Sequence, residues 1–285
     1  TPNGGSDSLD FGCAQTPVVA TVTGTEVSSG EGKLELKTTT GGTSAAKMTI
    51  AADGTVGIGT ANVPANDNTV TPTLNVAGSG VKGAAQITRH GSLGGGGALI
   101  QLAATRGNDV NSYTVVQDGD GIGQVAFLAA DGDEFVYAAS ITAQVDGTPG
   151  DNDMPGRLNF NTTADGAKGD TEKMRITSTG NVGINKTAPV TKLHIEGGGT
   201  SLPATTGTTP SAGTVLRIRP GNNAILDIGG NSTSGAWLQS YDQTGMQTEY
   251  PLLLNPNGGN VGIGIAAPLA KNHTFGAGTA VVVSG

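Results

Sequence analysis

The chain is poor in the residues that usually build or fasten a small protein interior. Aromatic residues make up 4% and charged residues 13% of its 285 residues. Cys13 is the one cysteine, so no disulfide can form within a chain, and no Cys/His cluster has the spacing of a zinc site. Because disulfides and metals are set aside, oligomerisation is the remaining way to stabilise a chain with so few bulky side chains.

Further absences exclude whole classes of protein. No run of about 20 apolar residues is present, so we expect no membrane insertion. The net charge is −8 and the pI about 4.7, which argues against a nucleic-acid partner because phosphate binding needs clustered Lys and Arg. No signal peptide is recognisable, and the chain begins at Thr1, as expected for a processed or truncated N-terminus.

Glycine is abundant instead, with 48 residues, more than twice its usual share of about 7%. One glycine-containing phrase returns three times: residues 53–59 read DGTVGIG, 180–185 read GNVGIN and 258–264 read GGNVGIG. Each copy follows a segment of strand character and precedes Val-Pro or Ala-Pro. We therefore predict a repeat of strand, glycine turn, short Val-Gly-Ile strand, proline turn and strand.

The phrase itself has a physical interpretation. Gly54, Gly180 and Gly259 are expected to supply turns with positive φ. The Val and Ile of each copy are two residues apart and share one face of a strand, whereas the glycine between them faces the other way and lets another backbone approach. These residues are our candidates for the repeat core and a trimer axis: Val56, Gly57, Ile58, Val182, Gly183, Ile184, Val261, Gly262 and Ile263.

The first two copies match over a longer stretch. Residues 32–39 parallel 156–163, residues 22–27 parallel 141–146, and residues 9–11 parallel 125–127. The remaining expected strands are short and bounded by turn residues, and no window shows a helical apolar face. They cover residues 85–89, 98–103, 113–117, 124–129, 138–145, 215–219, 225–228, 236–241 and 250–255.

Two long stretches resemble a known family. Residues 83–196, including ITAQVDGTPGDNDMPGRLNFNTTADG and EKMRITSTGNVGI, and residues 215–268, including LLLNPNGGNVGIG, resemble the repeated modules of phage and algal-virus tail fibres. Such modules commonly precede an endosialidase-type intramolecular chaperone. The resemblance implies an all-β, elongated homotrimeric fibre with intertwined chains. The chain departs from the pattern at Asn185, where the family usually has glycine, and it contains no self-cleaving chaperone segment.

The repeats suggest a division of the chain into modules. We expect a partial module, the back half of a unit, at 1–64, a linker with a module start at 65–82 and a full module at 83–196. A linker or loop follows at 197–213, then a third module at 214–268 and the start of a further module or a terminal strand at 269–285.

Several residues could carry chemistry, and each also has a plain structural interpretation. The acidic clusters 118–120, 131–134 and 151–153 contain calcium-type oxygens but lack the order of an EF-hand, and Asp-Gly pairs are ordinary turn formers. His90, His194 and His273 are far apart in sequence. Trp237 and Tyr241 are tentative surface-binding candidates, for which local packing is the favoured alternative. We expect no catalytic residues, no metal and no cofactor.

The sequence therefore predicts a non-enzymatic structural component of a virion tail fibre, serving as shaft and in host-surface attachment. Expected partners are two further copies of the chain, other tail or baseplate proteins, a host glycan or protein receptor, and an intramolecular chaperone during assembly. The alternatives are a glycan-cleaving tailspike enzyme, which would need paired carboxylates in an aromatic-lined groove, and a monomeric cell-surface β-repeat adhesin.

Overall fold

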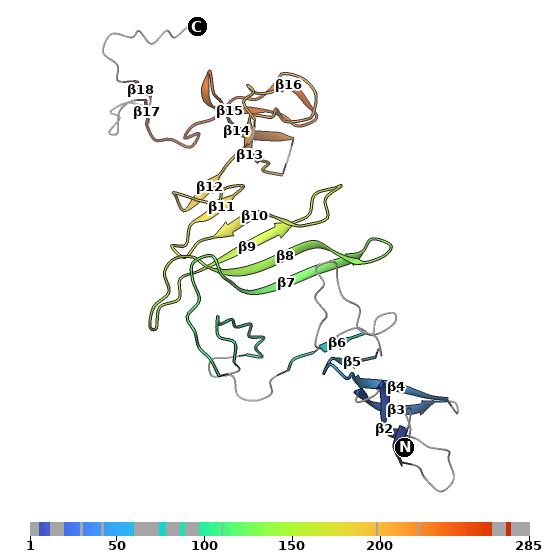
Figure 1. Cartoon of the computed structure of the whole chain (residues 1–285). Coiled ribbons are helices and arrows are strands. Elements are labelled where there is room, and N and C mark those ends of the chain that lie inside the picture. Colours follow the sequence, from blue (N-terminus) through green and yellow to red (C-terminus); the bar gives the residue numbers. More distant parts are fainter. Residues whose placement is uncertain are drawn as a thin grey trace. The chain divides into compact units, whose positions relative to one another are not determined.

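The expected all-β class is confirmed for the described part of the chain, in which every regular element is a strand (Figure 1). The chain divides into two compact units, Thr1–Lys173 and Met174–Gly285, with the boundary inside one strand of the expected module 83–196. The computed structural model describes residues 6–11, 20–28, 31–40, 43–59, 74–77, 86–88, 97–109, 111–197, 199–221, 223–263 and 272–274.

A six-stranded sheet lies near the N-terminus, with its strands in chain order. Neighbours from β1 to β5 are antiparallel, and β5 and β6 are parallel. Short turns and alternating side chains favour such a meander. The strands are β1 (Ser6–Phe11), β2 (Ala20–Ser28), β3 (Glu31–Thr40), β4 (Thr43–Ile50), β5 (Val56–Ile58) and β6 (Leu74–Val76).

The next six strands repeat this order, from β7 to β12. Strands β7, β8 and β9 are antiparallel neighbours, as are β10 and β11, and the parallel step returns between β11 and β12. The strands are β7 (Gly121–Ala130), β8 (Phe135–Val145), β9 (Gly156–Thr162), β10 (Thr171–Ile176), β11 (Val182–Ile184) and β12 (Leu193–Ile195).

The residue pairing confirms the alignment predicted between the two copies. Leu36 of β3 pairs with Val22 of β2. At the matching positions of the second sheet, Phe160 of β9 pairs with Ile141 of β8. Residues 9–11 also pair with β2 in the same register in which residues 125–127 pair with β8. Both copies therefore build the same supersecondary unit from the same sequence pattern.

The Val-Gly-Ile phrase forms a three-residue strand in all three copies, including β17 (Val261–Ile263), which pairs with β18 (Asn272–Thr274). Each phrase runs parallel to the strand after its proline turn, in one conserved register. The central glycine pairs with the middle residue of that strand in every copy: Gly57 with Asn75, Gly183 with His194 and Gly262 with His273.

The glycine turns are confirmed as well. Gly54, Gly180 and Gly259 have φ of 85°, 74° and 95°, values that only glycine adopts without strain. Asn185 has φ of 55°, and Gly59 at the matching position of the first copy has φ of 79°. Asparagine tolerates this left-handed conformation better than other side chains, so the departure at residue 185 preserves the turn.

The third module is built differently from the first two. Its four-stranded antiparallel sheet has the order β13, β14, β15 and β16. A small core of Ile225, Tyr241 and Met246 lies on it. The strands are β13 (Thr214–Ile218), β14 (Ala224–Asn231), β15 (Gly235–Asp242) and β16 (Gly245–Glu249).

Three predicted strands are wrong. Residues 98–103, 113–117 and 250–255 form no strand. Pro251 lies within the last segment and Pro256 follows it, and proline has no N–H to give to a ladder, so the expected antiparallel lead-in to β17 is missing. In the first two segments the large apolar side chains are exposed apart from Val116, which is buried, and no neighbouring strand of the described chain completes a ladder. Residues 86–88 are irregular, and the rest of the predicted strand 85–89 lies outside the described residues.

Candidate functional site

The main candidate site is an apolar sheet face that a single chain leaves open. One row of directly paired apolar residues crosses all six strands of the first sheet, and a second row is apolar over five strands and ends on Asp7 of β1. Directly paired residues lie on the same face. The first row is Leu9, Val22, Leu36, Met48, Ile58 and Val76. The apolar part of the second row is Gly24, Leu34, Ile50, Val56 and Leu74.

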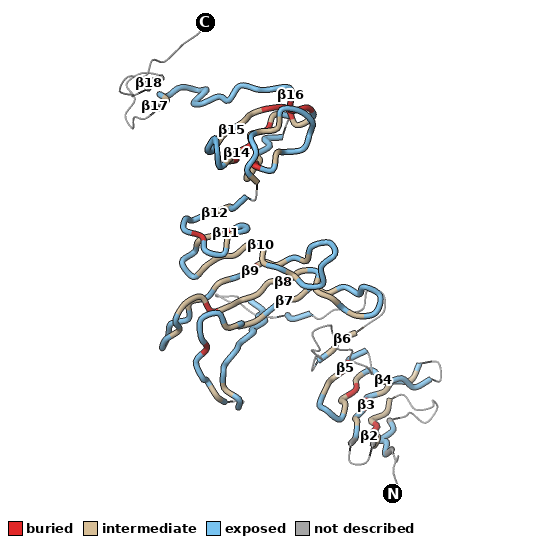
Figure 2. Tube along the Cα trace, turned by 45° about the horizontal axis from the view of Figure 1, so that its top comes forward, coloured by how far each residue is buried: buried red, intermediate tan, exposed pale blue. Residues whose placement is uncertain are grey.

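This apolar face is exposed to solvent. Leu9 is 61% exposed, Leu74 is 59% exposed and Ile58 is 40% exposed. Six strands about 4.8 Å apart span roughly 24 Å, and two rows cover roughly 14 Å along them, so the patch measures roughly 300 Å². This size is at the lower end of the range of about 300–600 Å² for the largest apolar patch on a typical monomer, and such patches are often functional. Figure 2 shows how few positions of the chain are buried.

The second sheet repeats the apolar face. Val125, Ile141 and Phe160 form one row across β7, β8 and β9. Met174, Ile184 and Ile195 form a row across β10, β11 and β12, beside a row of Ile176, Val182 and Leu193. Leu193 is 57% exposed and Ile184 is 38% exposed. The same face of the same unit is thus left open twice.

The opposite face of the first sheet is polar and more protected. Thr23, Glu35 and Thr49 pair in one row and are buried. Lys37 and Lys33 bind the Glu35 carboxylate at 2.9 and 3.0 Å, and the hydrogen bond and charge of Lys37 contribute most to lowering the Glu35 pKa. A single chain therefore covers its polar face and leaves its apolar face open, which reverses the usual arrangement.

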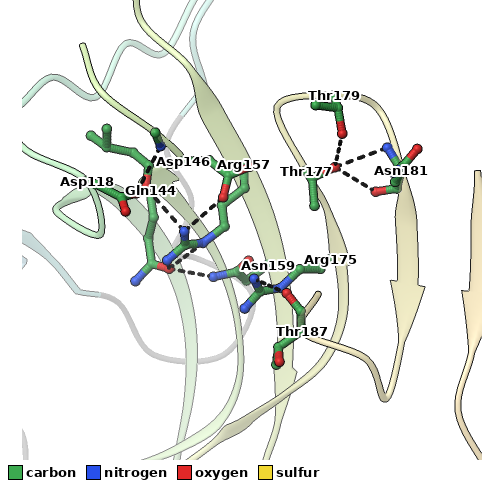
Figure 3. A network of polar contacts seen from close by, with 12 residues as sticks. Asp118, Gln144, Asp146, Arg157, Asn159, Arg175, Thr177, Thr179, Asn181 and Thr187 are labelled. Carbon is green, nitrogen blue, oxygen red and sulfur yellow. Dashed lines mark hydrogen bonds and ion pairs between the residues drawn. The ribbon is translucent and has the colours of Figure 1, made fainter. Parts of the chain in front are cut away.

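The second sheet satisfies its polar face with a hydrogen-bond network (Figure 3). Arg157 donates to the side-chain oxygen of Gln144 through two nitrogens, at 3.1 and 2.9 Å, and Asn159 donates to the same oxygen at 2.7 Å. Arg157 also pairs with Asp146 at 3.0 Å. Arg157 and Asn159 match Lys33 and Glu35 in the sequence alignment, so polar character recurs with different groups.

The structure places the candidate core residues on both faces. Val56 and Val182 are half-buried, and Ile58 and Ile184 are exposed, all on the apolar face. Val261 is half-buried, and the side-chain environments of Gly262 and Ile263 lie outside the described residues.

The glycine of the phrase contacts its own chain. Gly183 is buried, and a Cβ there would lie 2.1 Å from the carbonyl oxygen of Lys186 and 3.4 Å from Pro189 Cγ. The backbone that approaches this glycine is therefore the following proline turn of the same chain. The close approach that we expected at this glycine is thus made within one chain at Gly183, and its place at a trimer axis stays a prediction.

In the third module, Tyr241 belongs to a buried polar network and not to an exposed aromatic patch. Arg217 binds both oxygens of the buried Asp227 at 2.7 Å and donates to the Tyr241 hydroxyl at 2.8 Å, and that hydroxyl donates to Asp227. Burial and the bond to Asp227 raise the pKa of Tyr241 to about 12. Tyr241 is therefore packed inside and cannot stack on an external ligand. Trp237 is half-buried beside Gly229, whose missing side chain makes room for the indole ring.

The acidic clusters bind turns of their own chain. Asp118 accepts the Gly147 N–H at 2.9 Å. Asp120 accepts two bonds from Arg106 at 2.6 and 2.7 Å and one from the Gln117 N–H, and these bonds lower its pKa to about 2. Within the described ranges, no group of three or more His, Cys, Asp or Glu side chains could hold a metal ion.

Two of the three histidines lie in described strands. His194 lies on the polar face of β12, His273 lies in β18, and His90 falls outside the described residues. The described elements also include no helix of the length and hydropathy that spanning a membrane requires.

Sequence reasoning missed a surface groove in the first unit. Its volume is about 540 Å³, and its walls come from residues 104–116 and the turn at 149–154. Tyr113, Asp151 and Met154 are among the lining side chains. No sequence motif marks this groove, because the two segments are far apart in the chain.

Comparison with known proteins gives a limited result. No protein-family model and no curated protein matches the chain. Two solved structures that resemble it are both of the carboxy-terminal domain of the bacteriophage T5 L-shaped tail fibre, one of them with its intra-molecular chaperone domain. Sequence identity is 15% and 16%, and the TM-score is 0.47 in both cases.

The matched regions cover 72% and 73% of this chain. They span 60% of the structure that includes the chaperone domain and 90% of the other. At this level of likeness, function has to be argued from the chain itself.

Proposed function

We propose that the chain is a shaft segment of a viral tail fibre and that it works as a parallel homotrimer. The observation that carries this proposal is the exposed apolar face, which appears in both six-stranded sheets in the same register. Burying such a face is favourable by about 25 cal/mol for each Å² removed from water. In the described part of the chain, Leu102 packs over part of this face in the second sheet, and we infer that a second molecule covers the rest.

A second copy of the chain is the partner that fits this face best. Both rows are apolar except at Asp7, which pairs with Gly24 at the β1 edge of the sheet, so the face offers a partner mainly shape and apolar contact. A repeated unit leaves the same open face at each repeat, and identical copies can cover all of them in one register. The number three comes from the resemblance of the modules to viral tail fibres.

Host attachment is the second part of the proposal. Loops carried on a stiff scaffold are common places for binding, and the groove between residues 104–116 and 149–154 is such a place. Three copies in each fibre would give multivalent contact, which can exceed the affinity of a single site by about 10²–10⁴. A host surface glycan or protein would be the receptor.

Imaging of the particle that carries this chain tests the proposed role. An antibody against the chain should decorate tail fibres in electron micrographs, and its Fab fragment should reduce adsorption of particles to host cells. Label on another part of the particle would contradict the shaft role. Fibre label without any effect on adsorption would contradict the attachment role alone.

A further inference from the structure

An irregular segment beside the second sheet carries two large apolar side chains that nothing covers. Leu99 is 72% exposed and Ile100 is 73% exposed. Residues 98–103 belong to no strand, and the next residues are fixed by polar contacts: Thr105 donates to the Thr114 carbonyl at 3.0 Å, and Arg106 binds Asp120. These polar contacts therefore anchor the segment that carries Leu99 and Ile100, while the two side chains themselves remain exposed.

The same segment helps to form a pocket on the apolar face. Leu102 packs over β7, and a Cβ at Gly123 would lie 2.7 Å from Leu102 Cβ. The adjoining pocket has a volume of about 180 Å³, and Leu102, Val125, Ile141 and Leu158 supply most of its apolar lining. Leu99 and Ile100 of the same chain are not among its lining residues.

The size of this pocket suits an aliphatic side chain. A cavity of about 150 Å³ holds one benzene ring, so this pocket has room for one branched aliphatic group. Its lining contains no charged residue, and a charged or strongly polar occupant would lose its hydration without compensation. An apolar side chain is the occupant that this chemistry accepts.

We propose that Ile100, from the Leu99–Ile100 pair of one copy, fills the Leu102–Val125–Ile141 pocket of the next copy. This inference rests on the proposed homotrimer and identifies the residues of one contact within it. The contact is heterologous, because the inserting residue and the receiving pocket are different parts of the chain. A heterologous contact closes into a ring when its rotation permits, and three such contacts would join three copies.

Mixed assemblies of two cysteine variants test the contact. Both chains carry Cys13→Ser, one also carries Ile100→Cys, the other carries Val125→Cys, and the two have tags of different length. After joint refolding and reaction with a short bis-maleimide, which adds one thiol at each end, we expect a covalent product that contains one chain of each length. A Thr142→Cys chain is the matched control, because Thr142 lies on the polar face of β8, next to Ile141.

The outcomes separate this contact from the trimer itself. Trimers in which Ile100→Cys links to Val125→Cys at least tenfold more than to Thr142→Cys support the contact. Trimers without that link, or with equal linking to the control, overturn the contact and leave the trimer standing. A protein that stays monomeric overturns the proposed assembly and this contact with it.

A second pair of variants does not depend on cross-linking. Ile100→Asp would place a carboxylate in the apolar pocket, so we expect the trimer dissociation constant to rise at least roughly tenfold. The neighbouring exposed Gln101→Asp should change it less than roughly twofold. Equal effects of the two substitutions would overturn the contact.

Discussion

Replacing Leu193 with alanine should weaken the trimer far more than it alters the single chain. Leu193 is 57% exposed in one chain, and full burial of a leucine side chain is favourable by about 1.5–3 kcal/mol. If the trimer covers that exposed part, each chain gains about 1–1.7 kcal/mol from it and a trimer gains about 3–5 kcal/mol. Since about 1.4 kcal/mol is a factor of ten, Leu193→Ala should reduce the association constant roughly 10²- to 4 × 10³-fold.

Sedimentation of a dilution series measures this constant, and His194→Ala is the matched control. His194 is the next residue of β12 and lies on the polar face, so its loss should change association by less than roughly threefold. An unchanged association constant for Leu193→Ala, or equal effects of both substitutions, would refute the claim that copies meet through the apolar face.

Three further substitutions test local parts of the structure. Gly183→Ala should lower the free energy of unfolding by about 1–3 kcal/mol because its Cβ would meet the Lys186 carbonyl at 2.1 Å, whereas Gly230→Ala, with open space around it, should change it by less than about 0.5 kcal/mol in thermal melts. Arg106→Gln should raise the pKa of Asp120 from about 2 toward its ordinary value of 3.8 in an NMR titration; a value that stays near 2 would show that Arg106 is not the main cause. Asp227→Asn should cost about 3–5 kcal/mol because Arg217 loses its buried partner. Burial alone would raise the pKa of Asp227, but the bonds from Arg217 and Tyr241 lower it overall. The stabilisation that Asp227 gives the wild-type protein is therefore present above pH 3.8 and is lost as the pH falls through the lower pKa of the folded state. A variant that equals wild type at pH 7 would contradict this account.

Much of the fold could be predicted from sequence because the pairing is local. Strands β7 to β9 and β13 to β15 pair with their neighbours in the chain, so alternation and turn residues are sufficient to find them. The repeat predicted the positive φ of Gly180, whereas the parallel register of Gly183 against His194 became known only from the structure.

The failed strand predictions share a physical cause. Strand propensity describes a side chain's fit to a pleated surface and does not show whether a partner strand is present. Residues 98–103 and 113–117 have the composition of strands but no ladder in one chain. Strand β16, in contrast, contains Gly245 and Gln247 and little apolar alternation, so its pattern gave no signal.

The sites were harder to predict than the strands. The alternation of Trp237 and Tyr241 placed them on one face but did not reveal that Arg217 and Asp227 bury the tyrosine. The Lys186 carbonyl beside Gly183 depends on the geometry of the proline turn, which a motif does not encode. The open apolar face became visible only when cross-strand pairs joined residues from six separate strands.

Light scattering coupled to size-exclusion chromatography tests the central claim most directly. The chain has a mass of 28.1 kDa, and the account predicts a particle of close to three times that mass which persists on dilution. A well-folded particle of 28.1 kDa would contradict it, because the apolar faces of both sheets would then be stable in water without a partner.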